Sequence, residues 1–210
     1  VNYRQGIDGD MEQLIADMEA GTVGTLMILG ANPAYTWYNA DRFKSALKKV
    51  KVSVSFNEKM DETTELCEYV IPNHHYLESW GDAEICSGCT SFIQPTIYPL
   101  FKTRPYQTSL LKWGGNNGDY ETYFKEYWTG KLGSEEAYYK ALQDGIREEA
   151  PPTVSAGTYN SAGEATAASA ISAYKKGTGG ELVMYQKVSI GTGAQAGNPW
   201  LQELPDPVSK

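Results

Sequence analysis

Side chains that bind metals or form disulfides are scarce in this sequence. Its 210 residues include three cysteines and two histidines. Three cysteines are too few for a disulfide scaffold, and they do not indicate a redox compartment. All of these side chains fall in one stretch, CEYVIPNHHYLESWGDAEICSGC (67–89), which raises the question of a metal site.

Basic residues and long apolar runs are also few. Eighteen Lys and Arg residues stand against 26 Asp and Glu, which gives a net charge of −8. Binding to a nucleic-acid backbone requires clustered basic residues, so we expect no nucleic-acid partner. The longest apolar run, TLMILGA (25–31), is far shorter than the ~20 residues that cross a membrane, so we expect no direct membrane span.

The sequence still has enough apolar residues for a packed core. Hydrophobic residues make up 41% of the chain, which is sufficient for one substantial domain or two small ones. The chain begins at Val1 without an initiator Met and ends in the turn-rich LPDPVSK (204–210). We therefore expect a piece of a longer protein.

The first seventy residues alternate between helical and strand patterns. Apolar residues at helical spacing near residues 11–18 and 43–50 predict two amphipathic helices. TLMILGANP (25–33) reads as a buried strand that runs into a tight loop, and KVSVSF (51–56) and YVIP (69–72) read as further strands. Helices between strands favour right-handed crossovers, so we predict an α/β fold with a Rossmann-like parallel sheet.

We expect the α/β domain to extend over residues 1–150, with further segments after it. Residues 72–105 predict a long irregular excursion, and 106–149 a helical, aromatic segment that packs on the domain or against another subunit. The small polar residues of 151–180 predict a linker or surface excursion with one weak helix. ELVMYQKVSI (181–190) predicts a strand, so 181–210 would begin a C-terminal β domain.

Two motifs have the residue types of a site. The loop GANP (30–33) follows a predicted strand, where backbone N–H groups of a parallel sheet can meet a ligand, although Pro33 lacks one donor. CSGC (86–89) has the spacing of half a zinc or iron–sulfur site, but the other half is missing. Cys86 and Cys89 are therefore weak metal candidates, beside the alternatives of a disulfide or two free thiols.

The adjacent His74 and His75 are the other weak metal candidates. Neighbouring side chains in extended backbone point in opposite directions, so two adjacent histidines rarely share one ion. No recognisable nucleophile elbow lies nearby, and no catalytic triad can be assembled by spacing. We therefore predict no catalytic residue and no metal ligand here.

The order of several segments resembles the molybdopterin oxidoreductase superfamily, in the part running from its third domain into its fourth. The segments that carry the resemblance are LMILGANPAYTW, DETTELCEYVIPNHHYLESWGDAE, QPTIYPLFKTRPYQTSLLKW and GNPWLQELPDPVSK. They cover about 1–115 and 181–210. More narrowly, VIPNHHYLESWGDAE and NPWLQELPDP are similar to the molybdopterin-like half of the iron–sulfur subunit of bacterial alternative complex III.

The resemblance assigns positions by motif. Gly30, Asn32 and Pro33 match the loop that faces a pterin guanine dinucleotide in active relatives, and Glu78 matches the family's Leu-Glu. Residues 61–63 match the family's Glu-Thr segment. After Glu78, active relatives commonly continue with a Gly–Thr/Asn–Gly–Arg–Gln pattern, whereas here SWGDAEICSGCTSFIQ (79–94) follows, with the bulky Trp80. The expectation is a relic cofactor-facing loop with no cofactor bound by this segment.

The resemblance also implies a function. It implies a non-catalytic scaffold in a membrane-associated respiratory complex that transfers electrons from quinol to a periplasmic cytochrome or terminal oxidase. The parent complex would hold iron–sulfur clusters and haem c. The partners would be other subunits and the iron–sulfur half of the same subunit, and the segment would be peripheral on the periplasmic side of the bacterial inner membrane. The alternative is a segment of a catalytic molybdenum bis-pterin enzyme of the polysulfide or thiosulfate reductase type.

Overall fold

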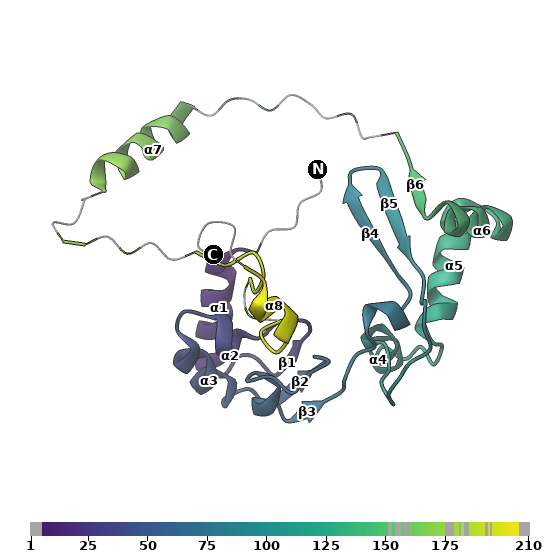
Figure 1. Ribbon diagram of the computed structural model, residues 1–210, viewed down its shortest axis with the longest axis horizontal. Helices are drawn as coiled ribbons and strands as arrows, with labels where there is room; N and C mark the ends of the chain where they lie inside the picture. The colour runs from purple at the N-terminus through teal and green to yellow at the C-terminus, as the bar shows by residue number, and fades with distance from the viewer. Residues whose placement is uncertain are drawn as a thin grey trace. The chain divides into compact units, whose positions relative to one another are not determined.

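The computed structural model describes most of the chain in two compact units, residues 1–153 and 154–210. The described residues are 6–150, 153, 157, 159, 161–174, 179–180, 182, 185–191, 193 and 195–205. Both sheets of the structure lie in the first unit (Figure 1).

A three-stranded parallel sheet opens the first unit. Its strands β1 (Thr25–Ile28), β2 (Val52–Ser55) and β3 (Tyr69–Val70) lie side by side in chain order. Ile28 pairs with Ser55, and Ser55 pairs with Val70. Helices α1 (Asp8–Glu19), α2 (Pro33–Thr36) and α3 (Ala40–Leu47) and the 3-10 turn η1 (Thr64–Leu66) precede or connect these strands. The predicted α/β class with a Rossmann-like parallel sheet is confirmed.

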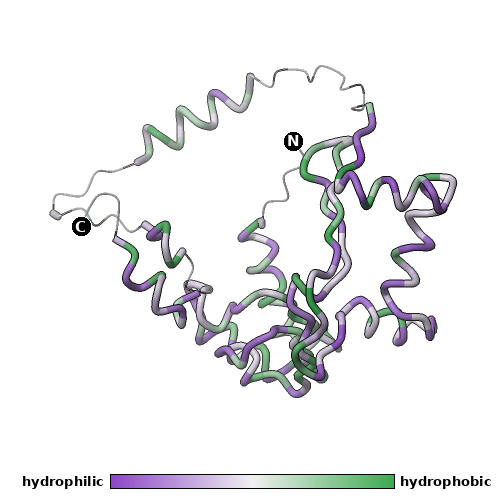
Figure 2. Tube along the Cα trace, turned by 45° about the vertical axis from the view of Figure 1, so that its right-hand side comes forward, coloured by the Kyte–Doolittle hydropathy of each residue, from purple (hydrophilic) through white to green (hydrophobic). Residues whose placement is uncertain are grey.

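The core of this sheet forms where the helices present their apolar faces. Hydrophilic and hydrophobic residues are mixed along the chain (Figure 2), and the buried residues of α1 and α3 are hydrophobic ones spaced three or four apart, as on one face of an amphipathic helix. The buried cluster joins α1, β1, α2 and α3 and consists of Ile15, Met18, Ile28, Ala34, Phe43, Ala46 and Leu47. Arg42 then ties α3 to α1, because its guanidinium donates to Glu12 at 2.6 Å and to Glu19 at 2.8 and 2.9 Å.

The first strand is shorter than the sequence suggests. The sequence predicts a buried strand in TLMILGANP that runs into a tight loop, and the observed β1 stops at Ile28, with the side chain of Leu29 42% exposed. The two faces of β1 also differ in solvent exposure, since Ile28 is 7% exposed and Met27 is 47% exposed. Only one face of β1 therefore contributes to the core.

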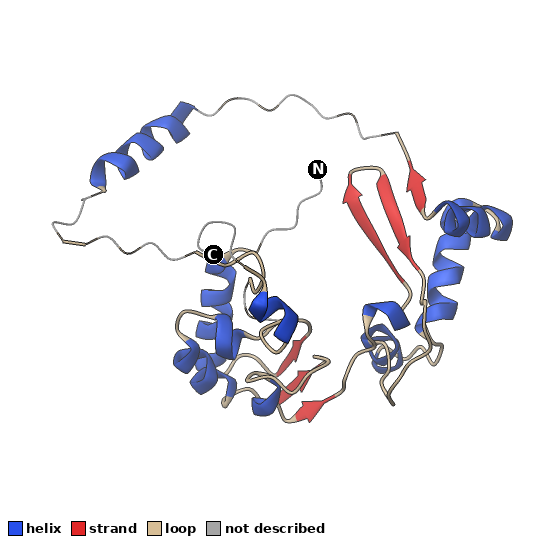
Figure 3. Cartoon of the chain, in the orientation of Figure 1, coloured by secondary structure: helices blue, strands red, loops and turns tan. Residues whose placement is uncertain are grey.

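The expected irregular excursion contains a regular hairpin. Strands β4 (Gly81–Cys86) and β5 (Cys89–Ile93) pair antiparallel, and β6 (Ile146–Glu148) adds to β5 (Figure 3). Cys86 pairs with Cys89 across a two-residue turn, in which Gly88 has a φ of 81°. A turn with positive φ is the usual two-residue connection of a hairpin, and Gly adopts it without strain. The prediction of irregular structure was wrong for 81–93 and holds for the loop from Gln94 to Pro105.

Three helices follow the hairpin, and the last two of them supply its core. They are α4 (Tyr106–Trp113), α5 (Tyr120–Leu132) and α6 (Glu135–Asp144). Asp119 and Ser134 cap the first turns of α5 and α6, and Gly133 and Gly145 end these helices with positive φ. The buried cluster between them and β5 is mainly aromatic and consists of Phe92, Phe124, Trp128, Tyr138, Ala141 and Leu142. A second stripe of tyrosines, Tyr123, Tyr127 and Tyr139, remains exposed.

The second unit holds two helices among its described residues, α7 (Ser161–Ala173) and α8 (Pro199–Glu203). None of the side chains of α7 is buried. Of the strand expected at 181–190, Leu182 and residues 185–190 lie in no strand, and 181, 183 and 184 fall outside the described residues. The β domain over 181–210 and the other domain boundaries stay predictions. No helix in the described ranges has the length and apolar character to span a bilayer.

We predict that the two faces of β1 differ in their contribution to stability. Ile28→Ala opens a cavity in the buried cluster and should lower the free energy of unfolding by about 2–5 kcal/mol. Met27→Ala, one residue away and about half exposed, should cost less than about 1 kcal/mol. Urea unfolding of the two variants measures the difference, and equal losses would contradict the burial pattern.

Candidate functional site

The loop after β1 is held by a side chain that follows β2. The N–H of Gly30 donates to Oδ1 of Asn57 at 2.7 Å, and Nδ2 of Asn57 donates to the carbonyl of Ala31 at 2.9 Å. The same Nδ2 lies 3.0 Å from a carboxylate oxygen of Asp61. Asn57 is buried, and Gly30 has a φ of 62°, which suits a glycine at this bend. The bend of the loop is therefore fixed from the neighbouring strand.

Asn32 is bonded at both ends of its side-chain amide. Its Oδ1 accepts from Thr63, from the N–H at 3.2 Å and from Oγ1 at 2.7 Å. Its Nδ2 donates to Glu62 at 2.7 Å, and this bond lowers the pKa of Glu62 below the ordinary carboxyl value. Oγ1 of Thr63 accepts from the N–H of Ala34 at 2.9 Å and has no exposure to solvent. Gly30, Asn32 and Pro33 thus lie together, closed against residues 61–64.

The polar groups of Gly30, Pro33 and the Asn32 side chain offer little to a pterin dinucleotide. A pyrophosphate needs free N–H donors or cations. Here the N–H of Gly30 is taken by Asn57, Pro33 has none, and both ends of the Asn32 amide are occupied. The charged groups in this network are the carboxylates of Asp61 and Glu62, which repel an anion. The N–H of Gly30 and the side chain of Asn32 are therefore engaged within the chain, and the charges beside them do not favour a phosphate.

Glu78 lies apart from that loop and anchors a different segment. It ends the short 3-10 turn η2 (Tyr76–Glu78), and its side chain is buried. One carboxylate oxygen accepts from the N–H of Leu100 at 3.0 Å, and the other accepts from the N–H of His75 at 3.1 Å. These backbone hydrogen bonds, that from Leu100 foremost, lower the pKa of Glu78. Glu78 therefore holds the loop 94–105 at Leu100.

His74 reinforces the same attachment. Its Nδ1 lies 2.6 Å from Oγ1 of Thr103 and 3.9 Å from the carboxylate of Glu78. Burial lowers the pKa of His74, which favours the neutral ring at neutral pH. The His75 ring accepts instead from the N–H of Leu77 and packs on Tyr76. The two histidines thus have different partners, as their adjacency in the chain suggested.

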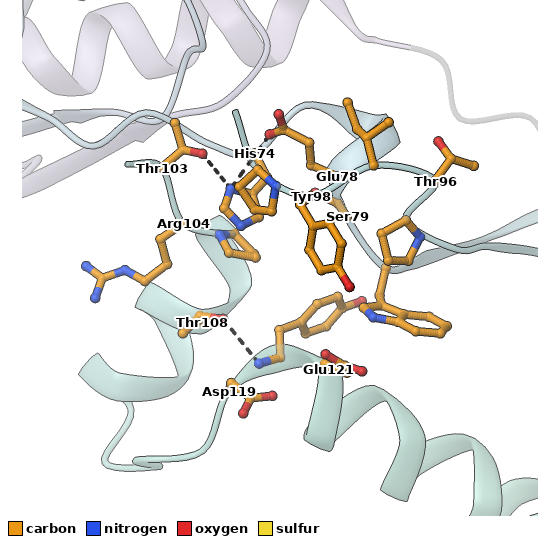
Figure 4. Close-up of a pocket in the computed structure, with 16 residues that line it drawn as sticks. His74, Glu78, Ser79, Thr96, Tyr98, Thr103, Arg104, Thr108, Asp119 and Glu121 are labelled. Atoms are coloured by element: carbon orange, nitrogen blue, oxygen red, sulfur yellow. Dashed lines mark hydrogen bonds and ion pairs between the residues drawn. The ribbon is translucent and has the colours of Figure 1, made fainter. Parts of the chain in front are cut away.

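A pocket of about 710 Å³ lies between residues 74–80, the loop 95–105 and the first turn of α5 (Figure 4). His74 and Glu78 line one side of it, and Asp119 and Glu121 line another. Trp80, Tyr98 and Tyr120 supply aromatic walls, and burial raises the pKa of Tyr120 to about 12, so its hydroxyl stays protonated. The sequence reading did not identify this pocket, because its walls come from three separate segments.

The cysteines are free and belong to the hairpin and the core. Cys86 and Cys89 face each other across the turn of β4 and β5, and Cys67 follows η1, with its thiol 3.4 Å from the carbonyl of Thr63. Within the described residues, no three His, Cys, Asp or Glu side chains are arranged to hold a metal ion. The spacing of the cysteines in CSGC is explained by a hairpin turn.

Comparison with known proteins finds similarity in sequence and in fold. No protein-family model matches it. Over 108 residues it is 34% identical to the menaquinone reductase, molybdopterin-binding-like subunit, of Nitratidesulfovibrio vulgaris, a match that covers 50% of this chain and 16% of that protein. Among solved structures, acetylene hydratase from Pelobacter acetylenicus shares the fold with a TM-score of 0.52 and 15% identity, over 66% of this chain and 20% of that chain. The chain spans about a sixth of the curated relative.

We predict that Thr63 contributes to stability through its hydroxyl. Thr63→Val keeps the shape but leaves the buried N–H of Ala34 without its acceptor, so the free energy of unfolding should fall by about 1–3 kcal/mol. Thr36→Val is the matched control, because the hydroxyl of Thr36 is exposed and bonds only its own helix, and it should cost within about 0.5 kcal/mol. Thermal or urea unfolding compares them, and equal effects would exclude the proposed role of Thr63.

We predict that acid releases the loop 94–105. Since the folded pKa of Glu78 lies below its ordinary value of 4.5, the stability that it contributes is complete above pH 4.5 and is lost as the pH falls through the folded pKa. The hydrogen-exchange protection of the Leu100 amide, corrected for the intrinsic rate, should therefore drop in that range. Glu78→Gln should remove this step, and an unchanged pH course in the variant would contradict the assignment.

Proposed function

The chain is a member of the molybdopterin oxidoreductase-like superfamily, and from this premise we propose that it is a non-catalytic scaffold segment of a quinone-linked respiratory complex. The match to a subunit of a menaquinone reductase supports the quinone link and a multi-subunit assembly. In this role the segment positions neighbouring parts of the complex and carries none of the electron-transfer centres itself.

The observation that carries the proposal is the packing of residues 80–93. The resemblance implies that, in active relatives, the corresponding stretch approaches the cofactor. Here the ring centroids of Trp80 and Phe124 lie 5.9 Å apart. The indole N–H of Trp128 donates a hydrogen bond to Asp82 at 2.8 Å. The ring centroids of Phe92 and Trp128 lie 4.8 Å apart. The segment that differs from active relatives therefore packs in the core of the hairpin, as a structural role requires.

The finer assignment follows the narrower sequence resemblance. We propose the molybdopterin-like half of the iron–sulfur subunit of alternative complex III, or of a close relative, on the periplasmic side of the bacterial inner membrane. The iron–sulfur clusters and haem c would be held by other parts of the assembly, which passes electrons from quinol to a cytochrome or oxidase. The net charge of −8 agrees with a peripheral, non-nucleic-acid-binding segment.

Elemental analysis of the purified parent assembly tests this proposal. We expect iron but no molybdenum or tungsten, because the N–H of Gly30 and the side chain of Asn32 are bonded within the chain. About one molybdenum or tungsten per copy would overturn the scaffold function. It would instead favour the alternative of a molybdenum bis-pterin reductase.

A further inference from the structure

The pocket beside α5 has walls suited to an organic cation. Its lining includes the aromatic side chains of Trp80, Tyr98 and Tyr120, and cations are attracted to the negative face of an aromatic ring. The volume of about 710 Å³ is sufficient for a long side chain and its backbone.

The charge of the pocket has the sign that a cation requires. Three carboxylates line it, those of Glu78, Asp119 and Glu121, against one guanidinium, that of Arg104. In Figure 4 the guanidinium of Arg104 points away from Tyr98 and Glu121. Glu78 and Asp119 already accept backbone hydrogen bonds, from Leu100 and Thr122. Within the described residues the side chain of Glu121 has neither a hydrogen bond nor an ion pair, so its carboxylate remains available.

Beside Tyr98, which lines the pocket, the loop 94–105 exposes the apolar side chains of Leu100 and Phe101, and we call these three residues the apolar rim. Tyr98 is 92% exposed, Leu100 is 72% exposed and Phe101 is 78% exposed. The loop that displays them is fixed at its base, because the N–H groups of Thr96 and Leu100 bond to residues 77 and 78. Pro95, Pro99 and Pro105 restrict it further. Large apolar side chains on a preorganised loop lose little entropy on binding, which is a property of docking surfaces.

We propose that this pocket and rim dock a segment of a partner protein in which a lysine or arginine is flanked by apolar residues. The basic side chain lies between the aromatic walls and reaches Glu121, and the flanking residues cover Leu100 and Phe101. A small cation alone would leave that rim exposed, and an anionic lipid surface would be repelled by the lining carboxylates. The inference rests on the proposed function in that the partner is a neighbour in the assembly.

Peptide titration of the whole, isotope-labelled chain tests this inference by NMR. The probes are acetyl-Leu-Arg-Leu-amide, its Glu counterpart acetyl-Leu-Glu-Leu-amide, and argininamide. We expect the Arg peptide to shift the amides of Tyr98, Leu100 and Glu121 and the indole N–H of Trp80, with a Kd on the order of millimolar for so small a ligand. The Glu peptide should shift them far less, and argininamide should bind more weakly than the Arg peptide.

Two variants locate the contact. Glu121→Gln should raise the Kd of the Arg peptide about two- to fivefold, because an exposed ion pair is lost. Glu126 is also exposed on α5, and Glu126→Gln should leave this Kd unchanged. Tyr98→Ala, at an exposed position that does not threaten folding, should weaken it by about two- to tenfold.

Three results would overturn the proposal. They are no shifts at about 20 mM Arg peptide, equal shifts with the Glu peptide, and argininamide binding as tightly as the peptide, which would indicate a small-cation site. None of them alters the metal content of the parent assembly, so failure here is distinguishable from failure of the scaffold function.

Discussion

The carboxylate of Glu78 joins parts of the first unit that the backbone alone would leave apart. It accepts from the N–H of His75 and from that of Leu100, which lie 3 and 22 residues away in the chain. A buried carboxylate without such donors would be costly, so the two bonds determine where the loop 94–105 lies. The position of that loop in turn sets one wall of the pocket and the display of Tyr98, Leu100 and Phe101. Both the docking surface and the link into α4 therefore depend on one ionised group.

Much of the parallel sheet could be predicted from the sequence, because its signals are local. Apolar residues at helical spacing and the strand pattern of KVSVSF give the element order, and the crossover rule gives parallel pairing. The ends of the strands were harder to predict from the sequence. Leu29 belongs to the same apolar run as Ile28 yet lies outside the strand. Its exposure depends on what covers each face of the sheet, which is a tertiary property.

The hairpin was missed for a specific physical reason. Most side chains of β4 are exposed, so GDAEIC has no alternation of apolar and polar residues to indicate a strand. Ser87 and Gly88 form the turn, but the flanking cysteines draw attention to metal chemistry instead. The site was predictable in part. Gly30, Asn32 and Pro33 do lie together, whereas Glu78 serves another segment, and Asn57 could have been found as a polar residue directly after a buried strand.

The aromatic cluster gives residues 80–93 the packing that the proposed function requires of a segment without a cofactor. A tightly bound cofactor stabilises the folded state by mass action, so a chain that does not use one must obtain comparable stabilisation from its own packing. Here β5 and α5 contribute Phe92, Phe124 and Trp128, whose ring contacts add about 0.5–1.5 kcal/mol per pair beyond burial. The hydrogen bond from Trp128 to Asp82 fixes β4 on the same helix. This packing buries Phe92, Phe124 and Trp128 and leaves the loop 94–105 and the tyrosines of α5 exposed, where the proposed function places contacts with neighbouring chains.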